Sequence, residues 1–275
     1  MFSIGAIEAM ARLGFAARGL MYMAIGYLAL RLGQTTDNTG ALTFIESAGG
    51  GIVLAIMALG FIGYGVWRLA DAALDSEGRG TDAKGIAKRV GGAVSGVIHL
   101  AFAWVSIKLA LGTGGSAGQA ASGSASGSGG GSGGAEQGAA TALSLPFGGV
   151  LLMIAAAVLF GVGAYQIVKA VKLGFLKHLD PAASRYEWVH WLGRIGFTAR
   201  GIVFAMSAVF LWRAAAASNA DAAGGTEQAL DAFPPWLRFL VAGGFFLFGV
   251  FSLVEARYRK INEPKVIDRL RAMAA

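Results

Sequence analysis

The apolar residues of this chain gather in six long runs that are almost free of charge. Residues 47–67 form a run of 21 uncharged residues, and residues 145–168 form a run of 24. A helix needs roughly 20 apolar residues to cross a bilayer core of about 30 Å. We therefore predict six transmembrane helices, near residues 13–31, 49–69, 90–108, 147–169, 194–213 and 236–256.

The composition favours a membrane protein over a soluble one. Hydrophobic residues make up 55% of the chain and charged residues 14%, whereas a soluble domain carries about 25% charged residues. Buried core helices of a soluble protein are the alternative, but six runs share membrane length and charged flanks. The first run follows no basic, cleavable leader, so we expect it to stay in the mature protein. The absence of cysteine excludes disulfides, a thiol nucleophile and thiolate metal ligands.

The odd-numbered runs begin with the same pattern, which indicates an internal repeat. The three copies read RLGFAARGLMY, RVGGAVSGVIH and RIGFTARGIVF, and each has a second cation nineteen residues after its first arginine. Nineteen helical residues rise about 28 Å, close to the hydrocarbon thickness. The first arginine and the later cation are Arg12 and Arg31, Arg89 and Lys108, and Arg194 and Arg213.

The even-numbered runs end in a second shared pattern. Residues 65–72 read GVWRLADA, residues 163–170 read GAYQIVKA, and residues 249–256 read GVFSLVEA. The repeating unit is therefore a two-helix hairpin. We predict an all-α, polytopic membrane protein with six transmembrane helices in three tandem hairpins related by pseudo-threefold symmetry. Residues 1–275 form a single membrane domain, with repeats at 11–78, 87–175 and 192–260.

The basic residues predict the orientation of the chain. If the N-terminus is cytoplasmic, 19 of the 23 lysines and arginines lie on the inner side, as the positive-inside rule requires. Both termini are then cytoplasmic, in a bacterial inner membrane. The net charge of +7 indicates topology and not nucleic-acid binding, because the cations are spread over short loops.

Two segments outside the runs are expected to be irregular or peripheral. The Gly- and Ser-rich residues 112–138 predict a disordered outer loop. The basic tail at residues 261–275 is expected to lie against anionic lipid headgroups.

No catalytic motif was found, so the sequence predicts no enzyme, no cofactor and no metal site. His178 and His190 fall in an inner loop with Asp180 and Glu187, where a solvated loop is favoured over a metal site.

His99 is the stronger candidate for a functional residue, because it lies ten residues after Arg89, near the middle of the membrane. An ionisable residue at that depth is a functional candidate, as a proton relay or a pigment or haem ligand. The repeats place Tyr22 and Phe204 in the same position, so the position requires a ring. With Ser95 one turn earlier to offer a hydrogen bond, we favour a structural role.

Two arginines lie inside the apolar runs, and each needs an explanation. Arg18 lies about 9 Å beyond Arg12 along the helix, where an unpaired arginine is costly. Side chains lean toward the N-terminus of their helix, so Arg18 and Asp71 lean toward each other, as do Arg200 and Glu255. The middle repeat has Ser95 and Lys169 at these two positions. We predict ion pairs within the first and third repeats; the alternative is that both arginines extend to the lipid headgroups.

The hairpin motifs resemble the bacterial DUF1206 family, a domain of unknown function that typically occurs as three two-helix copies. The resemblance rests on the openings of the form GFxARG, the closing YGVWRLADA and the final EARYRKI, and it covers residues 11–262. It implies the six-helix architecture and leaves the function open.

The function that we predict from the sequence is a non-enzymatic accessory or scaffold subunit of a membrane assembly. Its expected partners are membrane lipids, including anionic headgroups at the basic inner face, and other membrane protein subunits. The alternative is a small pore or transporter with a path along the pseudo-threefold axis. A membrane enzyme ranks third, because no acid and base are paired.

Overall fold

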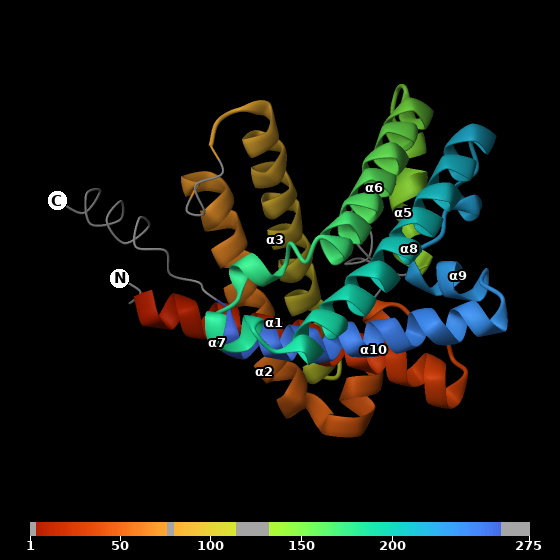
Figure 1. Cartoon of the computed structure of the whole chain (residues 1–275). Coiled ribbons are helices and arrows are strands. Elements are labelled where there is room, and N and C mark those ends of the chain that lie inside the picture. Colours follow the sequence, from red (N-terminus) through yellow and green to blue (C-terminus); the bar gives the residue numbers. More distant parts are fainter. Residues whose placement is uncertain (1–3, 76–79, 114–131, 260–275) are drawn as a thin grey trace.

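The computed structural model describes residues 4–75, 80–113 and 132–259, and almost all of these residues are helical (Figure 1). Short helical turns at Leu28–Leu32, Leu176–His178 and Ala220–Ala222 extend or connect the main helices. The helices are α1 (Ile4–Tyr27), α2 (Asn38–Leu74), α3 (Ala83–Ala110), α5 (Ser132–Leu143), α6 (Gly148–Val171), α7 (Pro181–Ser184), α8 (Glu187–Ala217), α9 (Thr226–Asp231) and α10 (Pro235–Tyr258).

Six of these helices are long and apolar enough to cross a membrane: α1 with its extension, α2, α3, α6, α8 and α10. The six predicted spans are confirmed, and each lies within one of these helices or, for 147–169, begins one residue before it. The protein is an all-α, multi-pass membrane protein.

Local sequence signals set where the long helices begin and bend. The side chain of Asp37 accepts a hydrogen bond from the backbone N–H of Gly40 and caps α2, and Asp82 caps α3 in the same way through Gly85. Within α2, Gly50 has φ 72° and ψ 176°, a backbone conformation that is essentially restricted to glycine. The predicted second span, 49–69, therefore begins where α2 breaks.

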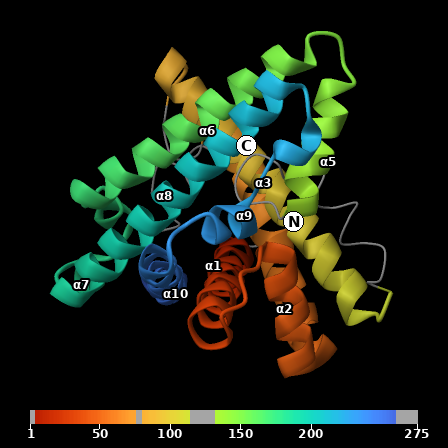
Figure 2. The same cartoon turned by 90° about the vertical axis from the view of Figure 1, so that its right-hand side faces the viewer.

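The six long helices form a ring that is open at one place. Helix α1 packs between α2 and α10; α3 packs on α2, and α8 packs on both α10 and α6. Helices α3 and α6 are the two ends of this series. They diverge toward the top of Figure 1, and they cross at an angle in the view of Figure 2. The opening lies between the two helices of the second repeat.

Three equivalent junctions connect the repeats around this ring. At each junction a glycine of one repeat lies against a glycine backbone of the next, so close that an added Cβ atom would lie 2.6–3.0 Å from the facing carbonyl oxygen. Small residues of this kind let membrane helices approach closely. Because these glycines occupy the same two positions in every repeat, the pseudo-threefold relation is visible in the junctions. The pairs are Gly19 with Gly249, Gly96 with Gly65, and Gly163 with Gly201.

The hairpins themselves are not equivalent, because only the first and third are closed. The shared aromatic position shows the difference: Trp67 is 8% exposed and Phe251 is fully buried, whereas Tyr165 of the second repeat is 59% exposed. In the closed hairpins the ring packs on a phenylalanine of the preceding helix, with centroids 6.2 Å apart for Phe15 and Trp67 and 5.7 Å apart for Phe197 and Phe251.

Two substitutions within the second repeat explain why its hairpin is open. Gly92 occupies the position that Phe15 and Phe197 hold in the other repeats, so Tyr165 has no ring to pack on there. Val158 occupies the position of Gly60 and Gly244. Its branched side chain prevents the close backbone approach that a glycine permits.

One predicted loop is partly helical. The segment 112–138 was expected to be disordered, but residues 132–138 belong to α5, which packs against α6 and α8. Alanine is the strongest helix former, and α5 contains Ala135, Ala139, Ala140 and Ala142. Residues 114–131 and the predicted basic tail at 261–275 lie outside the described residues.

Candidate functional site

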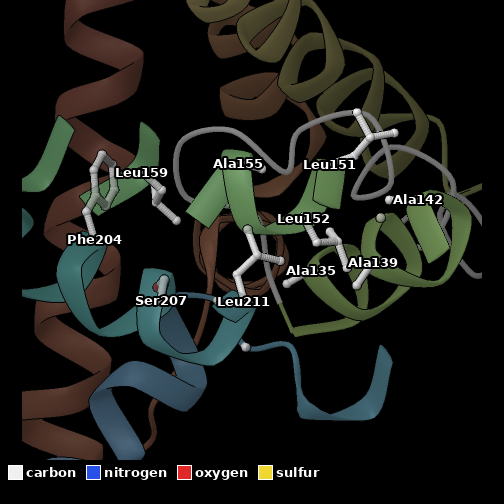
Figure 3. A pocket seen from close by; sticks show the side chains of 13 residues that line it. Ala135, Ala139, Ala142, Leu151, Leu152, Ala155, Leu159, Phe204, Ser207 and Leu211 are labelled. Carbon is white, nitrogen blue, oxygen red and sulfur yellow. The ribbon is translucent and has the colours of Figure 1, made fainter. Parts of the chain in front are cut away.

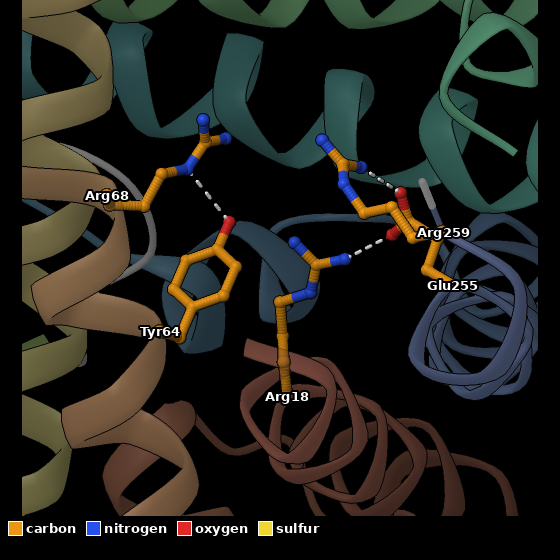
Figure 4. Close-up of polar contacts among 5 residues, drawn as sticks. All are labelled: Arg18, Tyr64, Arg68, Glu255 and Arg259. Carbon is orange, nitrogen blue, oxygen red and sulfur yellow. Dashed lines mark hydrogen bonds and ion pairs between the residues drawn. The ribbon is translucent and has the colours of Figure 1, made fainter. Parts of the chain in front are cut away.

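Cationic side chains from four of the long helices, and one just beyond the end of α10, converge on the interior of the ring. We call these cations the cation cluster. Two carboxylates, Asp71 and Glu255, lie beside it. Aromatic rings lie between the guanidinium groups, and Figure 4 shows three of the arginines pointing toward one another. The cations are Arg18 from α1, Arg68 from α2, Lys169 from α6, Arg200 from α8, and Arg259.

Glu255 is the carboxylate that two of these arginines share. One Nη atom of Arg18 donates to Glu255 Oε2, and Nη1 of Arg259 donates to Glu255 Oε1 over 2.7 Å (Figure 4). The Glu255 side chain is only 3% exposed. Both of its oxygens therefore take part in charge-assisted hydrogen bonds, which are stronger than neutral ones.

The predicted ion pairs within repeats are replaced by a pair between repeats. Arg18 of the first repeat is paired with Glu255 of the third. Oδ2 of Asp71 lies 3.8 Å from Nη1 of Arg68, which is on the same helix. The junction geometry is the reason. Arg18 precedes Gly19, which packs on α10 against Gly249, and Glu255 lies six residues beyond Gly249 in the same helix.

Arg200 has a different environment from its counterpart Arg18. Its guanidinium carbon lies 4.6 Å from the ring centroid of Phe248, 5.1 Å from that of Tyr22 and 5.2 Å from that of Phe204. Its Nε atom is buried, and within residues 4–75, 80–113 and 132–259 it has no hydrogen-bond acceptor. The predicted pair with Glu255 is therefore not formed, and ring faces stabilise this cation instead.

His99 occupies a position lined by aromatic rings. Its ring centroid lies 4.3 Å from that of Tyr64 on α2, and Nδ1 lies 2.7 Å from the backbone carbonyl oxygen of Ser95. The equivalent Tyr22 packs on Phe248 at the α1–α10 junction, with centroids 5.0 Å apart. Ser95 thus contributes its carbonyl group and not its hydroxyl.

Sequence reasoning missed the role of the first arginine of two repeats. Arg12 donates to the carbonyl oxygen of Ala256 over 3.0 Å, near the end of α10. Arg89 donates to the carbonyl oxygens of Ala72 and Ala73 over 2.8 and 2.9 Å, near the end of α2. Each cation therefore binds the carbonyl end of the last helix of another repeat, where backbone acceptors lack helical partners. The only sequence signal was the recurrence of the arginine.

A separate pocket of about 240 Å³ lies between α5, α6 and α8 (Figure 3). Alanine and leucine side chains dominate its wall, Ser207 is its one polar side chain, and the described lining includes no ionisable residue. The pocket can accommodate an apolar group, but its wall offers no acid or base.

The inner-loop histidines do not assemble into a metal site in the part of the chain that the structure describes. No group of three or more histidines and carboxylates is close enough there to hold an ion. His190 Nε2 lies 2.7 Å from the carbonyl oxygen of Ser184, which ties the start of α8 to the end of α7.

Comparison with known proteins supports the repeat architecture. The family model described as Domain of Unknown Function (DUF1206) matches residues 13–75, 115–172 and 195–259. A similar protein is the "Uncharacterized protein YxxB" of Bacillus subtilis (strain 168), 26% identical over 274 residues that cover 94% of each chain. No solved structure matches the chain.

Proposed function

Because the chain belongs to the DUF1206 family, a family without an assigned activity, we propose its role from its geometry: it is a non-enzymatic accessory subunit of a membrane assembly. In this proposal a transmembrane helix of another subunit packs against the open second repeat, between α3 and α6. In the same proposal both termini lie in the cytoplasm of a bacterial cell and the protein lies in the inner membrane, which the distribution of the basic residues supports.

The exposed ring of Tyr165 is the observation that carries this proposal. Trp67 and Phe251 occupy the same repeat position and are buried within their hairpins, whereas Tyr165 is 59% exposed. Helix α6 as a whole is the least covered: 28% of its apolar window is buried, against at least 44% for each of the other five. The surface that closes the other hairpins is thus available for another helix.

The opposite wall of the opening supports the same proposal. Gly91 of α3 has open space around it, whereas its counterparts are packed: a Cβ on Gly14 would lie 2.6 Å from the carbonyl oxygen of Gly60, and one on Gly196 would lie 2.7 Å from Phe248. A glycine in an open helix face permits the close approach of a neighbouring transmembrane helix.

The pore alternative receives less support. A path along the pseudo-threefold axis requires a closed ring of three hairpins, but the ring is open between α3 and α6. The rings of Phe15, Tyr22, Phe197 and Phe248 pack against the cations in the interior.

Cross-linking tests the proposal, because the chain has no cysteine of its own. Gly91→Cys and Val158→Cys, introduced together, mark the two walls of the opening. In native membranes we expect each introduced cysteine to cross-link to another polypeptide, and we expect little cross-linking between the two. Gly243→Cys on α10, another glycine with open space around it, is the control and should remain unlinked.

Cross-linking within one chain would contradict the proposal. If the two introduced cysteines join quantitatively to each other within one chain, the second hairpin closes on itself in the membrane. The opening would then not be a docking site, and the accessory role would lose its support. Cross-linking to a second copy of this chain would show that the other subunit is an identical protomer.

A further inference from the structure

The three junctions of the ring place the same two repeat positions next to each other, with different residues. One position is held by Arg18, Ser95 or Arg200, and the other by Asp71, Lys169 or Glu255. At the α1–α10 junction this brings together an arginine and a glutamate. At the α6–α8 junction it brings together Arg200 and Lys169.

The α6–α8 junction therefore holds two cations where its counterpart holds an ion pair. Lys169 Nζ lies 4.1 Å from the ring centroid of Phe197, one turn before Arg200 on α8. Glu255 also attracts Lys169 and Arg200 through space. Its single negative charge is hydrogen-bonded to Arg18 and Arg259, so it does not balance all four cations. A pair of cations in a membrane interior is costly unless an anion accompanies it.

Unused hydrogen-bond donors mark the same junction. Gln166 lies one turn before Lys169, on the face of α6 that is buried against α8, and its side chain is 6% exposed. Its Nε2 atom and the Nε atom of Arg200 are both buried and have no acceptor among the described residues. Buried donors in native proteins are normally satisfied, so within the described part of the chain this site lacks an acceptor of the kind that Glu255 supplies at the α1–α10 junction.

From this comparison we propose that the α6–α8 junction binds an oxyanion of the phosphate class, held by Lys169, Arg200 and Gln166. The anion supplies the negative charge that the Glu255 carboxylate supplies at the α1–α10 junction. A guanidinium group matches the geometry of phosphate oxygens, and a lysine supplies a point charge. The phosphate can belong to a lipid headgroup or be free in solution. This inference is independent of the docking proposed for the second repeat.

The test compares four proteins purified in a mild non-ionic detergent: the parent, Arg200→Gln, Lys169→Glu and Arg213→Gln. Arg213→Gln removes an exposed cation from the same helix and is the matched control. One arm measures the binding of phosphatidylglycerol and of phosphatidylcholine by native mass spectrometry. The other arm measures the melting temperature in sodium phosphate and in sodium chloride of equal ionic strength.

We expect the parent and Arg213→Gln to bind the anion equally, and Arg200→Gln to bind it about tenfold more weakly or worse. Selective retention of phosphatidylglycerol identifies a headgroup, and stabilisation by phosphate salt identifies a free anion. Lys169→Glu supplies an internal carboxylate, as Glu255 does at the other junction. It should fold and show no dependence on either anion.

Two results would overturn the proposal. One is that the parent binds phosphatidylglycerol no better than phosphatidylcholine and is no more stable in sodium phosphate than in sodium chloride. The other is that Lys169→Glu retains the anion response of the parent, since the introduced carboxylate and a bound oxyanion cannot share the site. The second result remains decisive even if Arg200→Gln fails to fold.

Discussion

At the scale of single residues, the buried arginines of this protein are stabilised by two kinds of contact, an ion pair and the faces of aromatic rings. Arg18 has a carboxylate and three ring faces, with the rings of Phe15, Tyr64 and Phe248 between 4.9 and 5.9 Å from its guanidinium carbon. Arg200 has ring faces alone among the described residues. The same repeat position therefore serves as half of an ion pair in one copy and as an available cation in another.

A double-mutant cycle should detect the pair between repeats. Arg18→Ala and Glu255→Ala should each destabilise the protein, and the double mutant should cost less than the sum by about 0.5–3 kcal/mol, because the two residues share one interaction. The measurement is the free energy of unfolding in detergent. A cycle on Arg18 and Asp71 serves as the comparison, and a coupling there as large as that of Arg18 with Glu255 would argue for pairing within the repeat.

Replacing His99 with phenylalanine should leave the fold intact. The ring position is lined by Phe61, Tyr64 and Phe102, and the substitution also removes a buried Nε2 atom that has no hydrogen-bond partner in the described structure. We expect His99→Phe to change the free energy of unfolding by less than about 1.5 kcal/mol. His99→Ala should cost about 3–5 kcal/mol by analogy with other buried rings. A large loss in the phenylalanine variant would show that the imidazole itself is required.

At the scale of elements, α2 shows how one glycine divides a helix into two segments. Residues 38–49 precede the break at Gly50, and the apolar run follows it. The neighbouring Gly51 packs against the end of α3, where an added Cβ would lie 2.9 Å from the carbonyl oxygen of Ala110. The break thus positions the start of the span against α3.

The backbone conformation, and not the space around it, should make Gly50 irreplaceable. Nothing lies within 4 Å of a Cβ added at Gly50 or at Gly243, but only Gly50 has a positive φ. Gly50→Ala should therefore destabilise the protein by about 1–3 kcal/mol. Gly243→Ala, in a regular helix, should be neutral or mildly stabilising. Thermal unfolding of the two variants in detergent provides the measurement, and equal stabilities would mean that α2 can straighten at no cost.

At the scale of the whole molecule, sequence repetition was enough to predict the six helices and the three two-helix units. It did not show which units contact one another at the charged positions. The middle repeat has Ser95 and Lys169 in place of an arginine and an acid, which suggested that these residues pair within a hairpin. Because the junctions join neighbouring repeats, the two changes fall at different junctions: Ser95 faces the first repeat and Lys169 faces the third.

The opening of the second hairpin was also beyond the sequence-based prediction. Gly92 and Val158 are unremarkable in an apolar helix, and their effect appears only when both are compared with the packed positions of the other hairpins. The terminal contacts of Arg12 and Arg89 were hidden for a related reason, since the carbonyl groups that they bind belong to the backbone and leave no trace in the sequence.

The orientation of the molecule is testable with reporter fusions. If the N-terminus is cytoplasmic, a reporter that is active only outside the cytoplasm should be active when fused after Thr113 and inactive when fused after Gly80. These residues lie at opposite ends of α3, just beyond it on each side. The reverse pattern of activity would invert the topology, and the larger set of basic residues would then face outward.

The pair formed by Arg18 and Glu255 has a consequence for how the protein is made. These residues are 237 positions apart, and they connect the first and last membrane helices. Because a chain is synthesised from its N-terminus, the arginine enters the bilayer long before its carboxylate exists. An incomplete chain that ends before α10 retains an uncompensated charge within the membrane. Arrival of α10 removes that charge, so the contact between α1 and α10 also distinguishes a chain that contains α10 from one that is truncated before it.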